Sequence, residues 1–136
     1  MTLTIVYTGK THTTGGRDGA SRSSDGELDI ALSPPGLKRA GTNPEQLFAA
    51  GWSACFLGAI GKAAGEHKVR LPADASIDAE VDLALDDEGF SLIARLNVSL
   101  PGIDRETAEA LAARAHEICP YSKATRGNIA VEITIV

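Results

Sequence analysis

The chain has 136 residues, the length of one globular domain, and 43% of them are hydrophobic and 23% charged. The net charge of −5 and the isoelectric point near 5.1 argue against nucleic-acid and anionic-membrane partners, because both need a basic surface. The longest apolar stretch is interrupted by Gly, Ser and Lys, and no secretion signal opens the sequence. We therefore expect a cytoplasmic protein with a single domain over residues 1–136 and no membrane span.

The first 40 residues alternate between strand and turn patterns. Apolar side chains at Leu3, Ile5 and Tyr7 predict a first strand, and a second run with period two covers residues 28–32. Between them, the pairs Asp18-Gly19 and Asp25-Gly26 predict tight hairpin turns.

A helix is predicted within the stretch TNPEQLFAAGWSACFLGAIGKAAG, residues 42–65. Asn43 suits the N-cap, Pro44 the first helical position, and Gln46 the place of a capping-box partner. The interior is crowded with glycine and alanine, and each interior glycine costs about 0.5–1 kcal/mol relative to alanine. Close approach of neighbouring backbone would explain this composition, so we expect a central helix that a homo-oligomer covers.

The second half predicts a hairpin, a helix and a last strand. Residues 76–85 and 90–100 alternate around a turn at 86–89, which indicates an antiparallel pair with one solvated face. Asp104 caps a helix that Pro120 stops just past Cys119, and a short link leads to a strand at 130–136. This order favours an α+β fold with antiparallel sheet over a doubly wound fold.

The chain has two cysteines, Cys55 in the first helix and Cys119 at the end of the second. Composition alone favours inert buried thiols, although a disulfide in a reducing compartment would be catalytic or redox-sensing. Gly51 and Gly58 flank Cys55 on its helix face and leave an open notch that either a packed side chain or a substrate could fill. The helix dipole disfavours an anion at Cys119, so Cys55 is the better candidate for an attacking thiolate.

A buried thiol needs a nearby cation to ionise at neutral pH. The candidates are Lys62 on the same helix and Arg17, Arg22, Arg39 and Arg126 elsewhere. Arg17 stands out in the turn Gly15–Gly19, although a solvated arginine at a hairpin tip is the simpler interpretation. Glu45 lies in the first turn of the helix, about 15 Å along the axis from Cys55, where it also stabilises the helix dipole. Unless the helix breaks, Glu45 would serve the Cys55 of another subunit.

The stretches TGGRDG, LSPPG, GTNPEQLFAAGWSACF and HEICPYSKAT resemble the organic hydroperoxide resistance proteins, a branch of the OsmC superfamily. The resemblance extends over essentially the whole chain. It implies an OsmC-like α+β fold in which antiparallel sheets pack around long central helices of an intertwined homodimer. It also implies a thiol peroxidase that reduces organic hydroperoxides, including lipid hydroperoxides, to alcohols.

The resemblance further implies a role for each candidate residue. Cys55 matches the peroxidatic cysteine, and Cys119 matches the resolving cysteine that forms a disulfide with it. Arg17 matches the arginine that holds the thiolate, and Glu45 matches the glutamate that pairs with that arginine. A dihydrolipoyl group would be the reductant, and no cofactor is expected to be bound. Phe48, Trp52 and Tyr121 are predicted to line the substrate pocket, with plain core packing as the alternative.

Two other functions remain open. The chain could be an OsmC-branch peroxidase with a different substrate preference, or a non-catalytic stress or ligand-binding dimer of the same fold. The histidines are scattered and none is spaced with a cysteine as a zinc ligand pair would be, so no metal site is expected. Phosphate-binding and serine-hydrolase motifs are also missing from the sequence.

Overall fold

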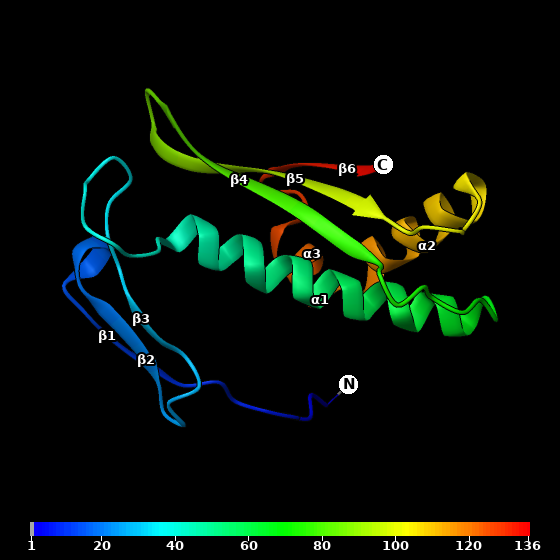
Figure 1. Ribbon diagram of the computed structural model, residues 1–136, viewed down its shortest axis with the longest axis horizontal. Coiled ribbons are helices and arrows are strands. Elements are labelled where there is room, and N and C mark those ends of the chain that lie inside the picture. Colours follow the sequence, from blue (N-terminus) through cyan, green and yellow to red (C-terminus); the bar gives the residue numbers. More distant parts are fainter. Residues whose placement is uncertain (1) are drawn as a thin grey trace. The chain divides into compact units, whose positions relative to one another are not determined.

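The computed structural model describes residues 2–136 and divides into two compact units, Met1–Pro44 and Glu45–Val136. The single domain expected over residues 1–136 stays a prediction, and each unit is described by itself. The first unit contains β1 (Thr11–Thr14), the 3-10 helix η1 (Gly16–Asp18), β2 (Ala20–Ser23) and β3 (Asp29–Ala31). The second contains α1 (Pro44–Glu66, from the unit boundary), β4 (Ser76–Asp86), β5 (Gly89–Ser99), α2 (Arg105–Ile118), α3 (Pro120–Thr125) and β6 (Ala130–Ile135) (Figure 1).

The first unit is a three-stranded antiparallel sheet in the order β1-β2-β3. The turn predicted at Asp25-Gly26 is confirmed, because Gly26 has a left-handed φ of 79° and Asp25 accepts a hydrogen bond from the amide of Glu27 at 3.0 Å. The strand predicted at Leu3–Tyr7 is wrong: residues 2–10 lie outside every strand of the described chain, and β1 begins at Thr11. Alternation marks a segment able to pair, but a strand forms only where a neighbour supplies its hydrogen bonds.

The turn that carries Arg17 is held in a conformation that only glycine permits. Gly15 and Gly16 have φ values of 72° and 58°, and a Cβ on Gly19 would overlap the carbonyl of Thr14. Asp18 closes the turn through its amide, which donates to the carbonyl of Gly15 at 3.1 Å. The sequence GGRDG is therefore explained locally by its backbone shape.

The second unit packs its helices against one face of the sheet β4-β5-β6 (Figure 1). The predicted hairpin is confirmed, with Ser76 opposite Ser99 and Asp86 opposite Gly89. The last strand differs from the expected antiparallel arrangement, because β6 pairs with β5 in parallel. The chain turns back through α2 and α3 before entering β6, and this helical crossover returns it in the direction of β5.

The core of this unit joins α1 to β5 and α2. Its largest fully buried side chains include Trp52, Phe56, Ile60, Leu96 and Leu111. The inner face of the hairpin is covered near Ser76 and Ser99 but becomes exposed toward the turn at residues 86–89.

The predicted helices are confirmed, and the link after Cys119 contains one more. Asp104 caps α2 by accepting a hydrogen bond from the amide of Thr107 at 3.0 Å. The six residues of α3 begin at Pro120, which fits the first helical position, so Cys119 ends α2 and begins α3. In the sequence, Pro120 marks the end of α2, but the six residues of α3 are too few to show helical periodicity of their own.

The helix α1 is long and apolar enough to cross a membrane, but core helices of soluble proteins are often equally long and apolar. Within the chain, 33% of its most apolar window is buried. Much of this apolar helix is therefore left uncovered by the rest of the second unit.

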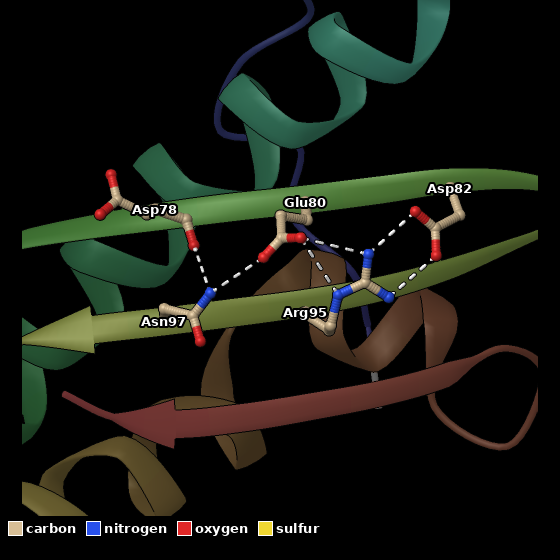
Figure 2. A network of polar contacts seen from close by, with 5 residues as sticks. All are labelled: Asp78, Glu80, Asp82, Arg95 and Asn97. Atoms are coloured by element: carbon tan, nitrogen blue, oxygen red, sulfur yellow. Dashed lines mark hydrogen bonds and ion pairs between the residues drawn. The ribbon is translucent and has the colours of Figure 1, made fainter.

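Outside the core, the solvated face of the sheet carries a polar network (Figure 2). Arg95 on β5 donates to both oxygens of Asp82 at 2.8 and 2.9 Å and also reaches Glu80 on the same neighbouring strand. These charge-assisted bonds join the two strands in the register that places the apolar side chains on the opposite face.

Candidate active site

The structure brings together the two cysteines that sequence analysis singled out. Cys55 projects from the middle of α1 and Cys119 lies at the junction of α2 and α3, and the two thiols are hydrogen-bonded to each other. Cys119 is fully buried, whereas Cys55 is partly exposed, and both are free thiols. The more accessible thiol is therefore the one on the long central helix.

The surroundings of Cys55 favour the protonated form of its thiol. Burial raises the pKa of Cys55, and so does the hydrogen bond with Cys119, which favours the protonated Cys55 thiol. The backbone amide of Tyr121 opposes both by favouring the thiolate. An unperturbed cysteine is already only a few per cent thiolate at pH 7, so a raised pKa leaves even less. A reaction that uses the Cys55 thiolate therefore needs a nearby cation that lowers this pKa.

The cations considered from sequence have different surroundings. Three are engaged elsewhere: Arg22 pairs with Asp29 at 3.8 Å, Arg39 pairs with Asp18, and Arg126 donates to the carbonyl of His116 at 3.0 Å. Arg17 is on η1 in the first unit. Lys62 lies on α1 and contributes to the wall of a pocket at Cys55.

This pocket has a volume of about 330 Å³, and it lies beside the Cys55 thiol. Its walls are Cys55, Gly58, Ala59, Lys62, Ile118 and Pro120. A Cβ added to Gly58 would meet no atom within 4 Å, so this glycine leaves open space beside the thiol. The notch expected from the glycine spacing is thus present on the Gly58 side.

On the other side of Cys55 the glycine serves a different purpose. A Cβ on Gly51 would lie 2.8 Å from the hydroxyl of Tyr121, so the missing side chain admits the tyrosine ring. Phe48 stacks on Trp52 with ring centroids 5.5 Å apart and lies 6.2 Å from the Tyr121 ring. Trp52 is fully buried and belongs to the core, whereas Tyr121 is 40% exposed. Contacts of these three aromatic residues with a substrate stay a prediction.

Glu45 does not meet Cys55 within the chain. The helix α1 is continuous from Pro44 to Glu66, so ten residues at 1.5 Å each separate the two by about 15 Å along the axis (Figure 1). The helix does not break, so the Glu45 carboxylate cannot reach the Cys55 thiol of its own chain.

Three residues that contribute to the site were not predicted as site residues from the sequence. Ser122 is fully buried on α3 and accepts a hydrogen bond from the indole of Trp52 at 3.3 Å. Ile118 and Pro120 flank Cys119 and close one wall of the pocket. The only sequence signal for these residues was their closeness to Cys119, because their contacts depend on the docking of α3 against α1.

Comparison with known proteins identifies the family. The family model described as OsmC-like protein matches residues 36–134. The organic hydroperoxide resistance protein of Xanthomonas axonopodis pv. citri is 45% identical over 135 residues, covering 96% of this chain and 95% of the relative.

Solved structures show the same fold. The crystal structure of the organic hydroperoxide resistance protein OhrB of Bacillus subtilis superposes with a TM-score of 0.92 at 42% identity, covering 97% of this chain and 100% of the other. The crystal structure of a putative organic hydroperoxide resistance protein from Vibrio cholerae has captopril bound in one of its active sites. It superposes with a TM-score of 0.91 at 37% identity, covering 99% of this chain and 95% of the other. The α+β, OsmC-like fold expected from sequence is confirmed, and the chain belongs to the organic hydroperoxide resistance branch of the OsmC-like family.

Proposed function

We propose that this protein is a thiol peroxidase that reduces organic hydroperoxides, including lipid hydroperoxides, to alcohols. The observation that carries the proposal is the contact between the thiols of Cys55 and Cys119 beside an open pocket. The names of the relatives, which describe resistance to organic hydroperoxides, support the same substrate class.

In the first step, the Cys55 thiolate attacks the distal oxygen of the hydroperoxide. The O–O bond breaks, an S–O bond forms, and the alkoxide takes a proton and leaves as the alcohol, so the sulfur becomes a sulfenic acid. The pocket suits this step because its walls beside the thiol are largely apolar, contributed by Ala59, Ile118 and Pro120.

In the second step, Cys119 attacks the Cys55 sulfur, an S–S bond forms, and the hydroxyl leaves with a proton as water. The two thiols are hydrogen-bonded to each other, and formation of an intramolecular disulfide requires such closeness. A dithiol then reopens the bridge by thiol–disulfide exchange and is itself oxidised. We propose a dihydrolipoyl group as this dithiol, acting as a co-substrate with no bound cofactor.

Arg17 and Glu45 complete the proposed site. Arg17 lowers the pKa of Cys55 and donates hydrogen bonds to the developing alkoxide, and Glu45 orients the guanidinium. The need for such a cation is supported by the burial and the Cys119 bond that raise the Cys55 pKa. Because about 15 Å separates Glu45 from Cys55 on one continuous helix, Glu45 acts at the Cys55 of a second subunit.

A homodimer, the proposed working form, would also cover apolar surface that the single chain leaves exposed. Leu85 and Phe90 at the tip of the hairpin are 68% and 71% exposed, and Leu3 is 94% exposed. The Vibrio cholerae relative has more than one active site, which agrees with one site per subunit. We propose a cytoplasmic location, where the reducing environment keeps both cysteines free between turnovers.

The test is consumption of tert-butyl hydroperoxide or a lipid hydroperoxide with dihydrolipoamide as the reductant. We expect rapid turnover by the wild type and none by Cys55→Ser. Without any dithiol, Cys119→Ser should reduce one equivalent of hydroperoxide and end as a Cys55 sulfenic acid detectable by mass spectrometry. Equal rates of hydroperoxide consumption by the wild type and Cys55→Ser would contradict the proposed peroxidase activity and favour a non-catalytic ligand-binding dimer. Preference for a hydroperoxide other than organic ones would favour the broader OsmC-type peroxidase.

A further inference from the structure

We infer that Lys62 selects hydroperoxides that carry a carboxylate, by binding this group at the end of the pocket remote from the Cys55 thiol. The inference rests on the proposed function, since it assigns the orientation of the substrate in the peroxidase site. It adds a specificity-determining residue to the reacting cysteines.

The first observation is the position of Lys62 relative to the thiol. Both residues line the same pocket and lie seven positions apart on α1. Seven residues make nearly two full turns, so the side chains leave the same face of the helix about 10 Å apart along the axis. A molecule that reaches from the thiol along this face therefore ends at the ammonium group.

The second observation is the chemistry of the walls between them. Gly58 and Ala59 line the pocket from α1, and Ile118 and Pro120 line it from the α2–α3 junction. This pattern fits an apolar chain with its peroxide at one end and a singly charged anion at the other. The volume of about 330 Å³ suits one such chain.

The third observation concerns the acidic group nearest to Lys62 on its helix. Glu66 lies one turn further on, where an i,i+4 ion pair would compete with a substrate. Arg114 on α2 already donates to both oxygens of Glu66, at 3.0 and 3.4 Å. The charge of Lys62 also acts on Glu66, but this carboxylate forms its ion pair with the Arg114 guanidinium, so the ammonium of Lys62 can still bind an anion in the pocket.

The test separates the peroxide step from the reductant. Fully reduced protein is mixed, without any dithiol, with a straight-chain carboxylic acid whose hydroperoxide group lies about 10 Å from the carboxylate. Its methyl ester is the neutral counterpart, and loss of free thiols in rapid-quench samples gives the rate constant for each. The ratio of the acid rate to the ester rate is compared between variants, so any change in Cys55 reactivity cancels.

We expect the ratio to fall about fivefold or more in Lys62→Glu, to be retained in Lys62→Arg, and to decrease with added salt in the wild type. Lys68→Glu is the matched control, because it makes the same charge change at an exposed residue beyond the end of α1. A ratio that is equal in the wild type and Lys62→Glu would overturn the role of Lys62. Failure of the wild type to react with either compound would instead overturn the proposed function.

Discussion

The indole of Trp52 donates a hydrogen bond to the hydroxyl of Ser122 at 3.3 Å, and both residues are fully buried. This bond ties α1, which carries Cys55, to α3, which begins directly after Cys119. A buried polar link between elements far apart in the chain thus joins the two segments that carry the thiols.

Replacing Ser122 by alanine should destabilise the protein by about 1–3 kcal/mol, because the buried indole N–H would lose its acceptor. Urea unfolding followed by tryptophan fluorescence would measure the change. Ser91→Ala, at an exposed position on β5, is the control and should have little effect. Equal stability of Ser122→Ala and the wild type would mean that the bond contributes nothing net.

The reactivity of Cys55 should respond to the loss of Cys119. The Cys119 hydrogen bond helps to raise the pKa of Cys55, so Cys119→Ala should move this pKa down and shift the pH profile of iodoacetamide alkylation to lower pH. A raised pKa in the folded protein also stabilises it below the unfolded-state pKa, and this contribution disappears as the pH rises through the folded-state value. An alkylation profile that stays in place or moves to higher pH would contradict the assigned cause.

The tip of the hairpin should control self-association. Leu85 and Phe90 lie directly opposite each other on β4 and β5, and both are more than two-thirds exposed in the single chain. Phe90→Asp should weaken the proposed dimer and shift the mass measured by light scattering toward the monomer. Ser91→Asp places the same charge on the opposite face of the same strand and should leave the mass unchanged. A monomeric wild type would contradict the dimer itself.

Stability should fall on acidification through His116. Burial, and then the positive charge of Arg126, lowers the pKa of this histidine, and its buried Nδ1 has no hydrogen-bond partner among residues 2–136. The folded state therefore prefers the neutral ring, a stability present above the unfolded-state pKa of about 6.5 and lost as the pH falls. Between pH 8 and pH 5, the unfolding free energy of the wild type should therefore fall relative to that of His116→Leu, which lacks the titrating ring. A constant difference between the two proteins would remove His116 from this role.

The sequence alone determined the features that depend on local chemistry. The helix beginning at Pro44, the hairpin around residues 86–89 and the cap at Asp104 follow from periodicity, turn residues and capping side chains within a few positions of one another. The family was also readable from sequence, because long motifs around Cys55 and Cys119 resemble it.

Only the tertiary structure decided which distant residues meet. It paired the thiols of Cys55 and Cys119, placed β6 parallel to β5, and left residues 2–10 outside every described strand. It also brought Ile118 and Pro120 to the pocket that Cys55 and Lys62 share. A local pattern indicates that a segment can pair or pack, but burial and hydrogen bonding over the whole chain decide which segment it meets. For Glu45, we expect the partner in a second copy of the chain.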